Sequence, residues 1–109
     1  LLPYVIEYNA TACRHRIADI AHALGLPGAT TRQLVNSLVD AIKNLNKKLG
    51  IKQTYRENGV SEEEYLKVAD FIAENAVADP CTGSNPRETD VESMRKVLDC
   101  AYYGKDVEF

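Results

Sequence analysis

The chain has 109 residues, which is enough for one domain at most. Hydrophobic residues make up 45% of it and the formal net charge is -3, so the composition excludes a disordered chain and argues against a dedicated nucleic-acid binder. The longest apolar runs are a few residues, too short to cross a bilayer, and no basic segment precedes one as in a signal peptide. We therefore expect a soluble globular helical domain with neither a membrane nor a nucleic acid as partner.

The first residues are apolar and carry no helix cap. The segment LLPYVI (residues 1–6) predicts that the chain is cut out of a longer sequence, and removal of a short leader is the alternative. Pro3 is compatible with a first helical turn, where its missing N–H would have no partner. Residues 2–9 are expected to be the end of a helix that begins outside this chain.

Apolar spacing predicts the next two helices. A stripe at Ile17, Ile20, Ala21 and Leu24 ends at Gly25. A longer helix, capped by Thr30 or Thr31, runs to Gly50. Its expected buried stripe consists of Leu34, Leu38, Ile42, Leu45 and Leu49, flanked by Val35 and Val39. Residues 53–58 are predicted to form one short helical turn.

The second half of the chain carries two patterns typical of capping boxes. Ser61 with Glu64 begins one helix, and Thr89 with Glu92 is expected to begin the last one, which Gly104 ends. The expected buried residues are Tyr65, Val68, Ala69, Ile72 and Ala76 on the first of these helices, and Val91, Met94, Leu98 and Ala101 on the second. No alternating run is long enough for a strand. These elements predict an all-α bundle of about five helices over residues 1–104, followed by a mobile tail over residues 105–109.

Few residues suggest chemistry. His15 and His22 are seven positions apart on one predicted helix, so about 10 Å separates their Cα atoms, which is too far to share one metal ion. No glycine-rich phosphate loop is present. The three cysteines are odd in number and form no CxxC pair, which favours reduced thiols in a cytoplasmic protein. We predict no catalytic, cofactor-binding or metal-binding residue within this chain.

The segment from Asp79 to Arg87 is unusual for a helix connection. It contains two prolines, a glycine and Cys81. Pro86 restricts Asn85 to an extended conformation, and the Asn85 amide can then fix the loop by hydrogen bonds. Arg87 can cap a neighbouring helix C-terminus or meet a carboxylate. These residues are compatible with the wall of a pocket and equally with a plain connection.

Five segments in the same order resemble the iron-containing alcohol dehydrogenases. They are LLPYV with YN (1–9), RIADIAHALG (16–25), LGI with GV (49–60), CTGSNPR (81–87) and YYGKD (102–106). The last segment is most similar to the alcohol dehydrogenase part of bifunctional aldehyde–alcohol dehydrogenases. Lactaldehyde reductases, propanediol dehydrogenases and butanol dehydrogenases are the alternative relatives, and the short connection from Asn9 to Arg14 is typical of monofunctional members.

The resemblance implies the C-terminal helical part of a dehydroquinate synthase-like fold. In the family, an N-terminal nucleotide-binding domain binds NAD(P), and one aspartate and three histidines hold Fe²⁺, all upstream of the LLP segment. We therefore expect the parent protein to be an NAD(P)-linked oxidoreductase of small alcohols or aldehydes and a homo-oligomer. This chain by itself is expected to bind neither cofactor and to be inactive.

The resemblance also assigns a role to the unusual loop. It implies that Cys81 faces the substrate cavity as a pocket-lining residue, while Asn85, Pro86 and Arg87 shape the loop. The chain would close one side of the catalytic cleft, and apolar surface normally covered by the missing domain would favour self-association. The alternative function is a stand-alone all-α protein-interaction module.

Overall fold

The computed structural model describes residues 1–109 and contains helices only, which confirms the all-α prediction. There are four α-helices rather than about five, and one short 3₁₀ helix. The elements are α1 (Leu2–Ala23), α2 (Thr31–Lys48), α3 (Glu62–Ala78), η1 (Pro80–Ser84) and α4 (Val91–Tyr103). None of these helices is both long and apolar enough to span a membrane.

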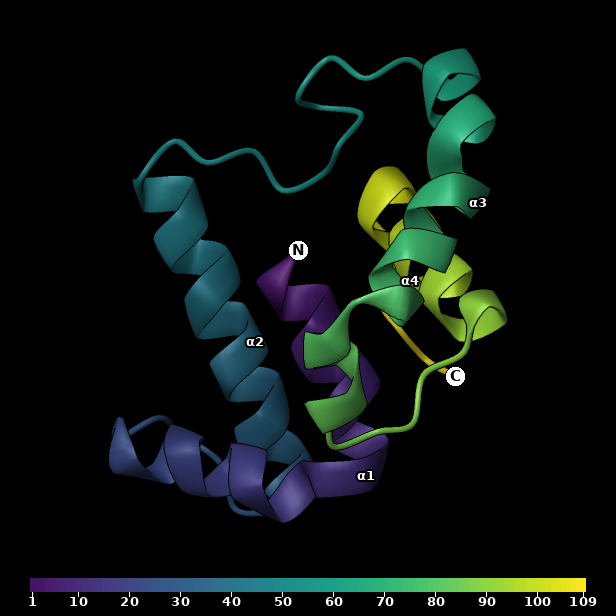
Figure 1. Ribbon diagram of the computed structural model, residues 1–109. Coiled ribbons are helices and arrows are strands. Elements are labelled where there is room, and N and C mark those ends of the chain that lie inside the picture. The colour runs from purple at the N-terminus through teal and green to yellow at the C-terminus, as the bar shows by residue number, and fades with distance from the viewer.

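The helices pack as two pairs. α1 lies against α2 and α3 lies against α4, and contacts between α1 and α4 join the pairs (Figure 1). A long connection from residue 49 to residue 61 runs from the end of α2 to the start of α3. Within the predicted turn at residues 53–58, the Asn58 N–H donates to the Thr54 oxygen at 3.3 Å, which is the bond of a single helical turn. The Glu57 carboxylate accepts from the N–H groups of Gln53 and Thr54.

The two helices expected before Gly25 are one helix with a kink, which accounts for the lower helix number. At Cys13 the backbone leaves helical geometry, with φ -135° and ψ 35°, and α1 changes direction (Figure 1). Side chains bind the nearby carbonyl groups: the Thr11 hydroxyl donates to the Tyr8 oxygen and the Cys13 thiol donates to the Asn9 oxygen. Bends of this kind arise where side chains take over main-chain hydrogen bonds.

Three of the four α-helices are capped at their N-terminus by a side chain. Thr30 forms a capping box with Gln33, and Ser61 forms the predicted capping box with Glu64. The capping box predicted for Thr89 and Glu92 is wrong. Asp90 is the N-cap of α4 instead, because this helix begins at Val91 and the Asp90 carboxylate lies 2.7 Å from the Ser93 nitrogen.

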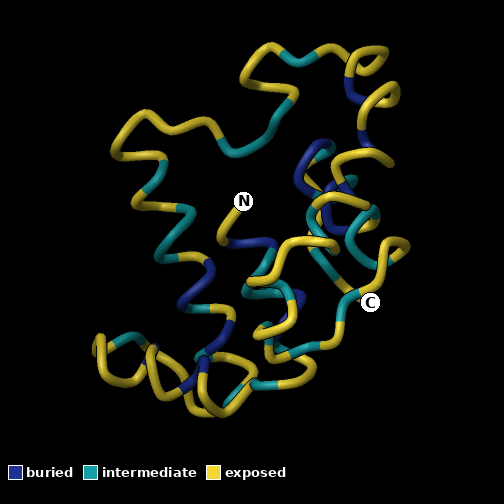
Figure 2. Tube along the Cα trace, in the orientation of Figure 1, coloured by how far each residue is buried: buried dark blue, intermediate teal, exposed yellow.

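The core is small and rich in tyrosine, and only 17 of the 109 residues are buried (Figure 2). One cluster joins α3 to α4 through Tyr65 and Tyr102, whose rings stack at 4.2 Å. A second joins α1 to α4 around Tyr4 and Tyr8, and a third joins α1 to α2. The N-terminal part of α1 thereby contacts the last helix of the chain.

Several residues expected in the core are exposed by more than a third. The spacing of apolar residues locates a helix face correctly, but it does not say whether another helix covers that face. The C-terminal end of α2 extends beyond α1 (Figure 1). On the other helix pair, α4 covers only part of the apolar surface of α3. The exposed residues are Ile20, Leu24, Leu45, Leu49, Val68, Ile72 and Val91.

Candidate functional site

The CTGSNPR loop (residues 81–87) is fixed locally by its own side chains. The Asp79 carboxylate accepts the Cys81 N–H at 2.8 Å and thereby caps η1. The Thr82 hydroxyl donates to the Ala76 oxygen at 2.5 Å, which ties the loop to the last turn of α3. The Ser84 hydroxyl donates to the Cys81 oxygen at 2.7 Å. The free thiol of Cys81 is therefore presented at the surface by a compact turn.

The second half of the loop is bound to α1. Asn85 adopts φ -65° and ψ 137°, the extended conformation that Pro86 predicts. The side-chain amides of Asn85 and Asn9 bind each other: Asn9 donates to Asn85 at 2.9 Å and Asn85 donates to Asn9 at 2.8 Å. The Asn85 amide also donates to the Arg87 main-chain oxygen at 2.7 Å. Asn85 thus makes hydrogen bonds of the kind that the sequence suggested, and its role in shaping the loop stays a prediction.

Arg87 continues this contact one residue earlier along α1. Its guanidinium lies over the Tyr8 ring, 3.9 Å from the centroid, and donates to the Tyr8 oxygen at 2.8 Å. The Tyr8 hydroxyl donates in return to the Glu88 oxygen at 2.8 Å. The acceptors of the guanidinium are two main-chain oxygens, that of Tyr8 near the kink of α1 and that of Phe109. The sequence had suggested a helix C-terminus or a side-chain carboxylate instead.

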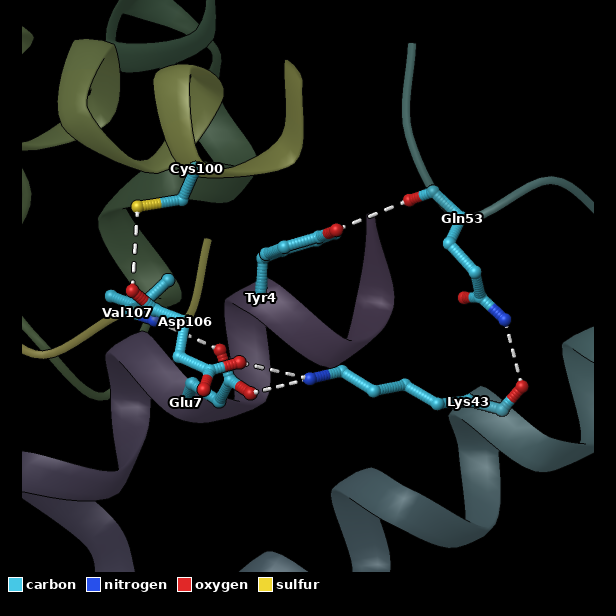
Figure 3. Close-up of polar contacts among 7 residues, drawn as sticks. All are labelled: Tyr4, Glu7, Lys43, Gln53, Cys100, Asp106 and Val107. Carbon is cyan, nitrogen blue, oxygen red and sulfur yellow. Dashed lines mark hydrogen bonds and ion pairs between the residues drawn. The ribbon is translucent and has the colours of Figure 1, made fainter. Parts of the chain in front are cut away.

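A second junction surrounds Glu7 of α1 and was not predicted (Figure 3). The Glu7 carboxylate binds the Lys43 ammonium of α2 at 3.1 Å and accepts the Val107 N–H at 3.0 Å. Asp106 binds the same ammonium at 3.2 Å. Burial lowers the pKa of Lys43, but its bonds to the two carboxylates outweigh that effect and the pKa is raised. No sequence spacing signals these contacts, because 36 residues separate Glu7 from Lys43 and 100 separate it from Val107.

The Tyr4 hydroxyl extends this junction to the long connection. It donates to the Gln53 oxygen at 3.2 Å, while the Gln53 side-chain amide donates to the Lys43 oxygen at 2.8 Å. Burial raises the pKa of Tyr4, so the hydroxyl remains a donor well into the alkaline range. One face of α1 therefore organises α2, the connection and the C-terminal residues.

The side chains of this chain do not fit a metal centre. No three His, Cys, Asp or Glu side chains come together in a group that can hold an ion. His15 and His22 are both exposed on the C-terminal part of α1. A hollow of about 590 Å³ lies between α1, α2 and residues 106–109, but its lining is mixed in charge and does not include Cys81.

The comparisons with known proteins decide the family. Residues 1–102 match the model described as "Fe-containing alcohol dehydrogenase family, C-terminal". This chain belongs to the iron-containing alcohol dehydrogenase family. The NADPH-dependent butanol dehydrogenase of Clostridium saccharobutylicum is 44% identical over 99% of this chain. The bifunctional aldehyde-alcohol dehydrogenase of Escherichia coli K12 is 37% identical over 92% of it.

A solved structure agrees with the sequence matches. The crystal structure of a 1,3-propanediol oxidoreductase superposes with a TM-score of 0.81 and 31% identity over 93% of this chain. The chain spans only part of each relative: 28% of the butanol dehydrogenase, 11% of the bifunctional enzyme and 26% of the propanediol oxidoreductase. The similarity to this C-terminal region confirms the predicted family and fold.

Of the four predicted site residues, Asn85 and Arg87 are bound to α1, whereas Cys81 is bound only within its own turn. Asn85 and Arg87 bind Asn9 and Tyr8, and Pro86 lies between them in sequence, so the residues predicted to shape the loop share one anchor on α1. Sequence reasoning missed Tyr8 and Asn9 as the partners of this loop. A signal was present, since both belong to the segment of residues 1–9 that carries the resemblance to the family.

Proposed function

We propose that this chain is the helical part of an NAD(P)-dependent, iron-containing alcohol dehydrogenase and forms one wall of its substrate cleft. The reaction would interconvert small alcohols and aldehydes, with iron and the nicotinamide bound by a nucleotide-binding domain outside these residues. The relatives support this class of activity, since they include a butanol dehydrogenase, an aldehyde-alcohol dehydrogenase and a lactaldehyde reductase. The absence of a ligand cluster among these side chains is the reason for assigning metal binding to the other domain.

The arrangement of the CTGSNPR loop is the observation that carries the proposal. Its two ends are bound by α3 and α1, and its exposed thiol is left free. A cysteine without an activating partner behaves as a small hydrophobic side chain, suited to contact the alkyl part of a substrate. We infer that Cys81 lines the pocket and does not act as a nucleophile.

The apolar surface of α3 supports the presence of a covering domain. Phe71 is 68% exposed, and Leu66, Val68 and Ile72 are also exposed on the same helix. A helix that is apolar over most of its circumference is normally buried in a larger protein. The same surface is compatible with the alternative, an all-α interaction module that binds another protein. For the parent enzyme we also propose a cytoplasmic location and a homo-oligomeric state.

A chimera tests the proposal directly. Residues 1–109 replace the matching C-terminal region of the Clostridium saccharobutylicum butanol dehydrogenase, and NADPH oxidation with butanal is measured. A turnover rate within about tenfold of the butanol dehydrogenase supports the proposed function, because a misplaced cleft wall lowers the rate about 100-fold. A folded chimera that binds NADPH and iron but has no turnover contradicts the proposal and favours the interaction module. The 109-residue chain alone is expected to bind no stoichiometric iron and to show no turnover.

A further inference from the structure

We propose that residues 106–109 form a strap that positions the CTGSNPR loop through Arg87. In this view Phe109 is a positioning residue: it contacts no substrate, but it restricts the loop that presents Cys81. The effect on substrate binding rests on the proposed function. The restriction of the loop is a property of the 109-residue chain and can be tested without any activity.

The start of the strap is bound on three sides. The Val107 N–H donates to Glu7 of α1 at 3.0 Å, and Asp106 binds Lys43 of α2 at 3.2 Å (Figure 3). The Cys100 thiol of α4 donates to the Asp106 oxygen at 3.7 Å. Only 14% of the Glu7 side chain is exposed, so its charge is held among these donors and away from bulk water. Three helices thereby define where the strap runs.

The end of the strap reaches Arg87. One guanidinium nitrogen, Nη1, donates both to the Tyr8 oxygen at 2.8 Å and to the Phe109 main-chain oxygen at 2.7 Å. The guanidinium also lies between two rings, with the Phe109 centroid 5.8 Å away and the Tyr8 centroid 3.9 Å away. The two rings are 5.9 Å apart. Arg87 therefore has one anchor on α1 and one on the strap.

Arg87 transmits this restraint to the loop. Its main-chain oxygen accepts from the Asn85 amide at 2.7 Å, and the same amide pairs with Asn9. Movement of Arg87 away from Tyr8 would strain both bonds of Asn85, the residue that directly follows η1. Phe109→Ala removes the ring from the guanidinium and leaves the main-chain oxygen of residue 109 in place, so it tests the cation–π part of this anchor.

The test measures motion at Cys81 on the intact 109-residue chain. Cys13→Ser and Cys100→Ser retain a hydrogen-bond donor at each position and leave Cys81 as the only thiol for a nitroxide label. In that background Phe109→Ala is expected to shorten the rotational correlation time of the label while the helical circular dichroism is retained. Ile51→Ala, which removes an exposed apolar side chain from the connection between α2 and α3, is the control and is expected to leave the label unchanged.

A double-mutant cycle separates the strap from a general loss of stability. If the strap acts through Arg87, Phe109→Ala adds little further mobility in an Arg87→Met background, because the connection is already broken. Additive effects of the two changes overturn the proposal, and so does an unchanged label in Phe109→Ala. Asp106→Asn gives a second route, since it weakens the strap without touching Arg87 or Phe109.

The chimera shows the consequence for substrate. Phe109→Ala in the active chimera is expected to raise the KM for long-chain aldehydes about tenfold with kcat nearly unchanged, because the chemistry stays intact while the wall loosens. An inactive chimera contradicts the proposed function only, and the label at Cys81 still decides the strap. Unchanged KM in an active chimera overturns the role of the strap in substrate binding.

Discussion

Asn9 of α1 and Asn85 of the CTGSNPR loop bind each other through both side-chain amides, although 76 residues separate them in the chain. Asn9 is 9% exposed and is the one polar residue in the buried core. Its amide needs a partner of matching geometry, because a buried polar group without one loses its hydrogen bonds to water. The pair therefore links the position of the loop to the stability of the fold.

Asn9→Ala is expected to lower the free energy of unfolding by about 1–3 kcal/mol, because it removes both bonds of the pair and leaves the half-buried Asn85 amide without this partner. Urea unfolding followed by circular dichroism measures this change. Asn44→Ala is the control, since Asn44 is exposed on α2, and surface changes usually stay within about 0.5 kcal/mol. Equal changes in the free energy of unfolding at the two positions would show that the Asn9–Asn85 pair contributes no more than an exposed side chain.

Cys81→Trp in the chimera is expected to raise the KM for longer alcohols, because the indole occupies space next to the alkyl chain. Cys81→Ala is expected to leave kcat nearly unchanged, since a pocket-lining thiol does not take part in bond formation. Steady-state kinetics with ethanol, butanol and hexanol provide the measurement. A collapse of kcat in Cys81→Ala would identify the thiol as a reacting group, and unchanged kinetics in Cys81→Trp would remove it from the pocket.

Acid is expected to weaken the caps of α3 and α4. Hydrogen bonds from the Ser61 hydroxyl and N–H lower the pKa of Glu64, and the Ser93 N–H lowers the pKa of Asp90. The two carboxylates bind a proton more tightly in the unfolded chain than in the folded chain. The stabilisation is therefore fully present above about pH 5 and is lost as the pH falls through the pKa values of the folded chain.

Glu64→Gln with Asp90→Asn tests this prediction, because both substitutions keep the capping groups and remove the titration. The double variant is expected to lose less stability than the parent chain between about pH 6 and about pH 3 in urea unfolding. Identical pH profiles would mean that other carboxylates cause the acid sensitivity.

Alkaline pH is expected to act mainly through Tyr65. Burial raises its pKa, and the Asp99 carboxylate, 2.5 Å from the hydroxyl, raises it further. The folded chain holds this proton more tightly than the unfolded chain, so stability is lost as the pH rises above about 10. Tyr65→Phe is expected to flatten this decline in urea unfolding. Phenolate absorbance of the parent chain is expected to show at least one tyrosine that ionises only on unfolding. Ionisation of all six tyrosines near pH 10 in the folded chain would contradict the assignment.

The exposed apolar residues of α3 are expected to cause self-association of the 109-residue chain. Phe71→Glu is expected to lower the apparent mass measured by sedimentation at high concentration, because it places a charge at the most exposed of these residues. Lys52→Gln changes the net charge by the same amount at an exposed site and is the matched control. A parent chain that is monomeric at every concentration would contradict this prediction.

The sequence by itself determined the helical class, the family and most helix ends. Helix periodicity and the Ser61–Glu64 capping box are local patterns, and local patterns can be recognised without knowledge of distant residues. The seven residues CTGSNPR likewise carried the resemblance and the expectation of a loop held by Asn85. These features depend on neighbours in the chain.

Only the tertiary structure decided which apolar faces are covered and which residues hold the loop. Leu45 and Leu49 follow the same spacing as Leu38, yet α1 covers Leu38 and leaves the other two exposed. The partners of Asn85, Arg87 and Glu7 lie 76, 79 and 100 residues away in sequence. Such pairs form because packing of α1 against α4 brings distant segments together, and no spacing along the chain encodes that distance.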